Sequence, residues 1–87
     1  HLHLGSARLD ALVGEAVEEQ SVATERAGLM VDTDLHADGH DVLIEPLSLG
    51  RVLTNLLSNA IKFTPRGGIV RVSTHVQGPR AIITVDD

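Results

Sequence analysis

The stretch from Leu49 to Thr64 constrains the fold of this chain most strongly, because it combines a helical hydrophobic period with an unusual polar stripe. At about 100° per residue, one face of such a helix is apolar and the opposite face is polar. The apolar positions are Leu49, Val52, Leu53, Leu56, Ala60 and Phe63, with Leu57 and Ile61 at the edge of the face. The polar positions are Arg51, Asn55, Ser58, Asn59 and Lys62. The pattern predicts an amphipathic helix with Leu56 at the centre of its buried face.

The polar stripe carries two asparagines one turn apart, Asn55 and Asn59, and Lys62 follows them. Asparagine in a helix interior costs roughly 0.5 kcal/mol relative to alanine, so two on one stripe favour a functional explanation. A carboxamide oxygen suits Mg²⁺, which takes few protein ligands and several phosphate or water oxygens, and a lysine supplies a point charge for phosphate. From spacing alone, a magnesium–polyphosphate site and an ordinary solvated helix face are both open.

The run Asn55-Leu-Leu-Ser-Asn-Ala-Ile-Lys-Phe-Thr-Pro65 resembles the N box of sensor histidine kinases at every one of its positions. The resemblance implies a Bergerat-type ATP-binding domain with ATP and Mg²⁺ as cofactors. It also implies that Asn59 helps to bind Mg²⁺ and that Lys62 contacts phosphate. Asn55 sits where ATP-hydrolysing relatives place a glutamate that activates water. Because an amide cannot accept that proton, Asn55 favours phosphoryl transfer to a protein over ATP hydrolysis.

The end of the chain, Thr84-Val-Asp-Asp87, is similar to the strand that precedes the Asp-x-Gly-x-Gly motif of the same family. In that motif the aspartate binds the adenine amino group. The spacing after Val85 makes Asp87 the first adenine-binding candidate and Asp86 the second. The resemblance therefore implies the ATP-binding set Asn55, Asn59, Lys62, Phe63 and Asp87, in which Asn55, Asn59 and Lys62 are catalytic. Since the glycines of the motif are not in this sequence, residues 1–87 are expected to be a partial catalytic domain.

The remaining segments predict one more helix and four strands. An apolar period from Leu9 to about Ala27 predicts an amphipathic helix that Gly28 ends. Two short strands, 29–35 and 41–45, are expected to pair as an antiparallel hairpin, and strands 69–76 and 81–85 form a second hairpin. This order predicts an α+β, two-layer sandwich with helices on one face of a mostly antiparallel sheet. It is similar to the first half of a Bergerat-type domain.

Composition excludes several classes of protein. The 87 residues contain no cysteine, carry a formal charge of −5 and include a single aromatic residue, so disulfides, a basic stripe for nucleic acid and base-stacking platforms are not expected. No apolar run reaches the roughly 20 residues that span a bilayer, so membrane contact of this segment is not expected. The loop 36–41 holds two histidines and two aspartates, for which a polar turn is favoured over a metal site.

The family resemblance also implies partners and a location. These are a histidine-bearing dimerisation domain in cis or in trans, a response regulator and the cytoplasm, with membrane anchoring of a longer parent left open. None of the five histidines here lies in the His-Glu-x-x-x-Pro context of a phosphoacceptor. An ATP-dependent protein histidine kinase is therefore expected, but the segment alone is not expected to be active. The alternatives are a regulatory ATP-binding module similar to anti-sigma-factor serine kinases, and a non-catalytic domain.

Overall fold

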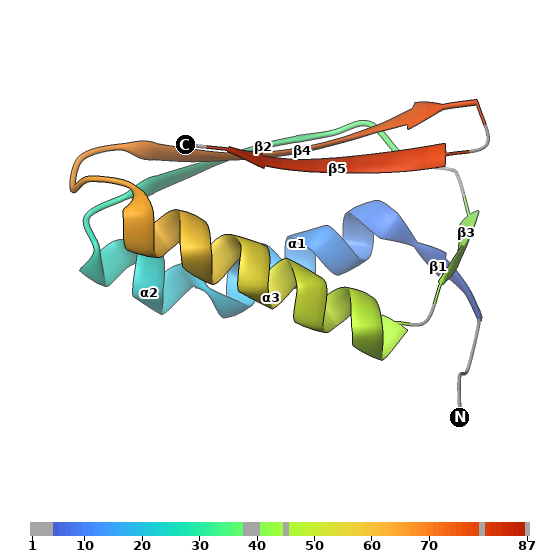
Figure 1. Ribbon diagram of the computed structural model, residues 1–87, viewed down its shortest axis with the longest axis horizontal. Coiled ribbons are helices and arrows are strands. Elements are labelled where there is room, and N and C mark those ends of the chain that lie inside the picture. The colour runs from blue at the N-terminus through green and yellow to red at the C-terminus, as the bar shows by residue number, and fades with distance from the viewer. Residues whose placement is uncertain (1–4, 38–40, 45, 79, 87) are drawn as a thin grey trace.

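A computed structural model describes residues 5–37, 41–44, 46–78 and 80–86. Its elements are β1 (Gly5–Arg8), α1 (Leu9–Glu19), α2 (Ser21–Arg26), β2 (Met30–Leu35), β3 (Asp41–Ile44), α3 (Pro46–Phe63), β4 (Ile69–Gln77) and β5 (Arg80–Asp86). The three helices lie on one face of the sheet that β2, β4 and β5 form (Figure 1). The α+β, two-layer architecture predicted from the sequence is confirmed.

The main sheet has the strand order β2-β4-β5, in which β4 runs parallel to β2 and antiparallel to β5. A separate antiparallel pair joins β1 to β3. The predicted hairpin of β4 and β5 is confirmed, whereas the predicted pairing of strands 29–35 and 41–45 is wrong. A parallel pair needs a long crossover connection, and α3 supplies it between β2 and β4. This arrangement lets α3 cover the sheet, which a local hairpin of β2 and β3 would not.

The first predicted helix is divided into α1 and α2 at Gln20, whose backbone angles are φ −93° and ψ 5°. Weak helix formers in the second half, Ser21, Val22 and Thr24, favour such a break. Gly28 ends α2 as predicted, with φ 70°. Its N–H donates to the Glu25 carbonyl at 3.0 Å, and the Leu29 N–H donates to the Thr24 carbonyl at 3.0 Å. These two bonds form a Schellman motif, which requires the left-handed conformation that glycine tolerates.

The core lies between the helices and the sheet. Leu53 and Leu57 of α3 are 1% and 2% exposed, and they belong to the same buried cluster as Val13 of α1 and Val70 and Val72 of β4. The predicted orientation of α3 is therefore wrong at the centre of the buried face, which Leu53 and Leu57 occupy instead of Leu56. Apolar periodicity defines a face but not which part of a wide face meets the neighbouring elements, and here the packing of α1 and the sheet selects the Leu53–Leu57 side.

The outer part of the predicted apolar face of α3 is exposed instead. Val52, Leu56 and Phe63 retain 51%, 40% and 69% of their accessible surface. The helix ends at Phe63 as Pro65 requires, and the Thr64 hydroxyl donates to the Ala60 carbonyl at 2.6 Å. The end of α3 thus presents apolar side chains to a surface rather than to the core.

The turn after α3 is attached to the turn that follows α2. The Gly67 N–H donates to the Gly28 carbonyl at 2.9 Å, and the Met30 N–H donates to the Gly68 carbonyl at 3.1 Å. The Arg66 guanidinium donates to the Arg26 carbonyl at 3.3 Å, at the carboxyl end of α2. These contacts hold the end of α3 beside the beginning of β2 and β4.

Candidate functional site

A hollow of about 310 Å³ lies where α3 meets β5. Its lining residues are Leu56, Asn59, Ala60, Phe63, Val85 and Asp86. In Figure 1, α3 runs along the face of the sheet near the end of β5 that leads to the C-terminus. The fold therefore brings a helix carboxamide, Asn59, to the same hollow as a strand-end carboxylate residue, Asp86.

The hollow combines an apolar wall with polar groups. Leu56 and Phe63 are exposed, and Val85 is half-buried. On a helix, residues three and four apart are neighbours, so Leu56, Asn59 and Phe63 form one stripe. Such a surface can hold a planar ligand against its apolar part while the Asn59 carboxamide provides a polar contact.

The residues predicted from the sequence are only partly brought together. Asn59 lines the hollow, as does Phe63. Asn55 and Lys62 are exposed on α3 but are not among the lining residues, and Arg51 is exposed one turn earlier. The Lys62 ammonium lies 5.4 Å from the centre of the Phe63 ring, which keeps the positive charge next to the hollow.

The strand end supplies the second half of the site. Asp86, the second adenine-binding candidate, lines the hollow. Asp87, the first candidate, lies outside the described residues. Leu56 was missed by the sequence reasoning, which placed it in the core. Its spacing of three residues from Asn59 was the signal that could have placed it at the site.

Asn59 is available to a ligand. It is exposed, and no described residue forms a hydrogen bond with its carboxamide. The amide oxygen is therefore free to coordinate a cation that favours oxygen ligands, such as Mg²⁺, whose other ligands are phosphate and water oxygens. Because Mg²⁺ usually keeps several of those ligands, a single carboxamide is a suitable protein contribution.

The alternative metal position near His36 receives no support from the described residues. His36 Nε2 lies 2.6 Å from Asp34 Oδ1, and both side chains are exposed. Within the described ranges, no three histidine or carboxylate side chains gather as metal ligands would. Residues 38–40 of this loop lie outside the described residues, as do His1 and His3.

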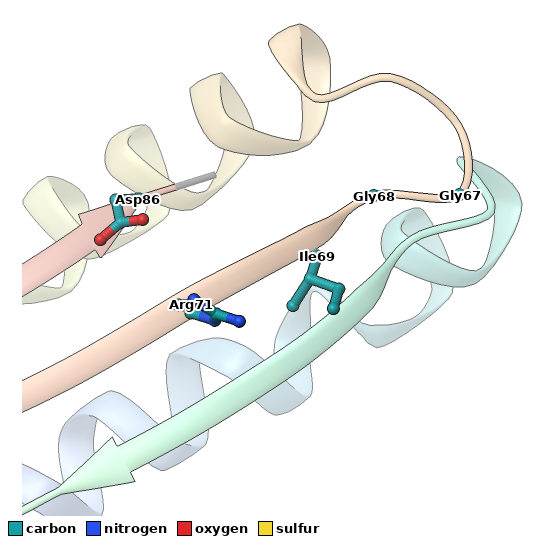
Figure 2. A pocket seen from close by; sticks show the side chains of 5 residues that line it. All are labelled: Gly67, Gly68, Ile69, Arg71 and Asp86. Atoms are coloured by element: carbon teal, nitrogen blue, oxygen red, sulfur yellow. The ribbon is translucent and has the colours of Figure 1, made fainter.

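A second hollow, of about 360 Å³, lies on the face of the sheet turned away from the helices (Figure 2). Gly67, Gly68, Ile69, Arg71 and Asp86 line it. Arg71 forms an ion pair with Asp32, in which Nε of the arginine lies 4.0 Å from Oδ2 of the aspartate. Although this hollow is the larger one, none of its residues belongs to the asparagine stripe. The hollow beside α3 is therefore the candidate site.

None of the helices in the described part of the chain is both long enough and apolar enough to cross a bilayer.

Comparisons with known proteins agree with this fold. No protein-family model matches the chain. The sensor-like histidine kinase SenX3 of Mycobacterium tuberculosis is 37% identical over 79 residues, which are 91% of this chain and 19% of SenX3. The adaptive-response sensory kinase SasA of Synechococcus is 33% identical over 81 residues, or 92% of this chain and 22% of SasA. The chain thus spans about a fifth of the length of these relatives.

Solved structures show the same fold. The catalytic domain of histidine kinase ThkA superposes with a TM-score of 0.91 at 17% identity, covering 97% of this chain and 57% of that one. The cytoplasmic segment of histidine kinase QseC gives a TM-score of 0.79 at 26% identity, over 83% of this chain and 48% of that one. The fold is therefore that of a histidine kinase catalytic domain.

The chain is homologous to sensor histidine kinases, over a segment that corresponds to part of their ATP-binding catalytic domain. Two further solved structures of histidine kinases contain a ligand or a partner protein. Full-length ShkA was solved in complex with AMPPNP, with a TM-score of 0.85 at 24% identity over 98% of this chain and 18% of that one. ThkA was solved in complex with the response regulator TrrA, with a TM-score of 0.87 at 17% identity over 94% of this chain and 25% of that one.

Proposed function

We propose that the hollow between α3 and β5 binds Mg²⁺-ATP, and that this chain is the ATP-binding part of a sensor histidine kinase. In such a kinase it supplies the phosphate site for transfer to a histidine located elsewhere in the protein or on another chain. The observation that carries the proposal is that Asn59 of the helix and Asp86 of the strand end line one hollow. The complex of ShkA with AMPPNP, an analogue of ATP, supports the choice of ligand.

Each residue has a distinct part in the proposed site. The Asn59 carboxamide would hold Mg²⁺, which, when bound, neutralises phosphate charge. Lys62, next to the Phe63 ring, places its ammonium at the phosphates. Phe63 and Leu56 contact the apolar faces of the nucleotide, and Asp87, with Asp86 as the alternative, accepts a hydrogen bond from the adenine amino group.

Phosphoryl transfer needs mainly positioning and charge neutralisation, and the helix face supplies groups for both. Asn55 lies one turn before Asn59 on the exposed face of α3. Its amide contacts phosphate or water but has no basic atom to take a proton from water. The γ-phosphoryl group is thereby kept for a histidine acceptor, and hydrolysis is not promoted.

The proposed partners are a histidine-bearing dimerisation domain and a response regulator, with the cytoplasm as the place of action. The complex of ThkA with TrrA supports a response regulator as partner. The dimerisation domain supplies the acceptor, because none of the histidines of this chain has the sequence context of a phosphoacceptor.

A titration of the 87-residue chain with Mg²⁺-ATP, followed by ¹⁵N–¹H NMR, tests the site. We expect the largest shift changes at the Asn59 side-chain amide and at the backbone of 85–86. We also expect a dissociation constant weaker than micromolar, because an exposed charge contact contributes only about 1 kcal/mol and micromolar affinity needs about 8 kcal/mol. The same titration of Asn59→Ala should lose the magnesium dependence. Chemical-shift changes confined to the second hollow, at Arg71, would contradict the proposal.

A further inference from the structure

The last turn of α3 is not held in place by the hydrophobic core. Leu57 is buried, but each of the residues from 58 to 63, all of them described, is exposed or half-buried. Lys62 and Phe63 are exposed, and Phe63 retains 69% of its accessible surface. Helix ends fray unless other groups satisfy and fix their last turn. The position of Lys62 and Phe63 therefore depends on the residues that follow the helix.

Thr64, the next residue, is buried, with 9% of its surface exposed. Its N–H donates to the Ala60 carbonyl at 3.0 Å, and its hydroxyl donates to the same carbonyl at 2.6 Å. Ala60 is one of the residues that line the hollow between α3 and β5. The Thr64 side chain thereby attaches the segment after the helix to the helical turn that borders the candidate site.

Gly68 packs directly against the Thr64 side chain. Residues 65–68 form a turn in which the Gly68 N–H donates to the Pro65 carbonyl at 2.9 Å, and Gly67, at its third position, has φ 90°, as in a type II turn. Gly68 itself does not have a positive φ, so space explains the glycine there. An added Cβ would lie 2.6 Å from Cγ2 of Thr64 and 3.0 Å from the Pro65 carbonyl oxygen. The Thr64 methyl group thus occupies the space that a side chain at position 68 would need.

We propose that Thr64, packed against Gly68, is a positioning residue that keeps the last turn of α3 in the geometry that binds the nucleotide. This inference rests on the proposed function, in which Lys62 lies at the phosphates and Phe63 contacts an apolar face of the nucleotide. With the Thr64 contacts intact, the ligand meets a turn that is already ordered. Without them, only a fraction of the molecules has this turn ordered, and the apparent dissociation constant rises by the inverse of that fraction.

A positioning role differs in its kinetics from a role in stability alone. Loss of order in the last turn weakens the binding of the substrate and of the transition state equally, so KM for Mg²⁺-ATP rises while kcat stays the same. A loss of global stability instead lowers the fraction of folded enzyme, which lowers kcat and leaves KM unchanged. Measurement of both constants therefore separates the two roles.

Autophosphorylation of a histidine kinase that carries this segment together with its phosphoacceptor tests the proposal. Thr64→Val keeps the shape of the side chain but removes the hydroxyl, and KM for Mg²⁺-ATP should rise about two- to tenfold, as loss of one hydrogen bond predicts. Thr64→Ser keeps the hydroxyl and should have a KM closer to that of the wild type. Thr54→Val is the matched control, because the exposed Thr54 hydroxyl donates to the Gly50 carbonyl at 2.9 Å, and its KM should be unchanged.

The contact between Thr64 and Gly68 allows a test by compensation. Gly68→Ala places a Cβ against the Thr64 methyl group and should also raise KM. Thr64→Ser removes Cγ2, the nearer of the two obstructing atoms, so the double variant should recover most of the loss. Changes that act independently would add instead of compensating, and additivity in this pair would overturn the proposed contact.

Hydrogen exchange of the 87-residue chain tests the order of the last turn without nucleotide. Thr64→Val should speed amide exchange at residues 62–63, and Thr64→Ser should speed it less. The ring signals of Phe63 report on the same turn, because Phe63 is the only aromatic residue of the chain.

The outcomes separate this inference from the proposed function. Unchanged exchange in Thr64→Val would overturn the inference alone, as would a fall in kcat at constant KM. A wild-type chain that shows no chemical-shift change with Mg²⁺-ATP would overturn the proposed function and this inference together, even where Thr64→Val speeds the exchange.

Discussion

The hydroxyl of Thr74 on β4 donates a 2.6 Å hydrogen bond to Oδ1 of Asp10 in the first turn of α1. Thr74 is 1% exposed, so this bond crosses the interface between the helices and the sheet. The second carboxylate oxygen of Asp10 accepts from the Ala37 N–H at 3.0 Å, and the Thr74 hydroxyl accepts from the His36 N–H at 2.9 Å. One carboxylate thereby joins α1, β4 and the segment that follows β2.

Removal of this carboxylate should destabilise the fold. Asp10→Ala leaves the buried Thr74 hydroxyl and the Ala37 N–H without their acceptor, at a cost of about 1–3 kcal/mol in the free energy of unfolding. Urea denaturation followed by circular dichroism measures it. Asp32→Ala is the matched control, because its side chain is 68% exposed, and it should change stability by no more than about 0.5 kcal/mol. Equal losses in the two variants would show that the Asp10 bonds do not contribute.

The orientation of α3 predicts different costs for two adjacent leucines. Leu57 is 2% exposed and Leu56 is 40% exposed. Leu57→Ala should therefore cost about 2–5 kcal/mol, as truncation of a buried leucine does, and Leu56→Ala clearly less. Thermal and urea unfolding of the two variants compare them directly. A larger loss of stability for Leu56→Ala than for Leu57→Ala would instead support the orientation predicted from periodicity, with Leu56 at the centre of the buried face.

The Schellman motif at Gly28 gives a prediction with a control of opposite sign. Gly28 has φ 70°, and an added Cβ would lie 2.7 Å from Cγ of Arg66. Gly28→Ala should cost on the order of 1–2 kcal/mol. Gly14 lies inside α1 with nothing within 4 Å of an added Cβ, so Gly14→Ala should stabilise by roughly 0.5–1 kcal/mol. Paired melting curves measure both, and a stabilising Gly28→Ala would exclude the proposed strain.

Autophosphorylation should depend on the side chain of Asn59 and not on that of Ser58. In a histidine kinase that carries this segment together with its phosphoacceptor, Asn59→Ala should abolish autophosphorylation with Mg²⁺-ATP and leave the fold intact. Removing an exposed carboxamide takes nothing from the core. Ser58→Ala, an exposed change one residue earlier and outside the hollow, should keep activity. Radiolabel incorporation from ATP measures both, and normal labelling of the Asn59 variant would refute its proposed role.

The sequence by itself determined the elements whose signals are local. The 3.6-residue period defined α3, proline and glycine defined the ends of α3 and α2, and alternation defined β4 and β5. The run from Asn55 to Pro65 was also enough to indicate the family, because that motif is contiguous in the chain.

Only the tertiary structure decided the features that depend on which surfaces meet. β2 pairs with β4, 39 positions along the chain from Met30 to Ile69, and no local pattern specifies that partner. The same holds for the side of α3 that is buried and for the meeting of Asn59 with Asp86 in one hollow. The physical reason is that periodicity sorts residues by face within an element, whereas strand partners and burial follow from the free energy of packing all elements together.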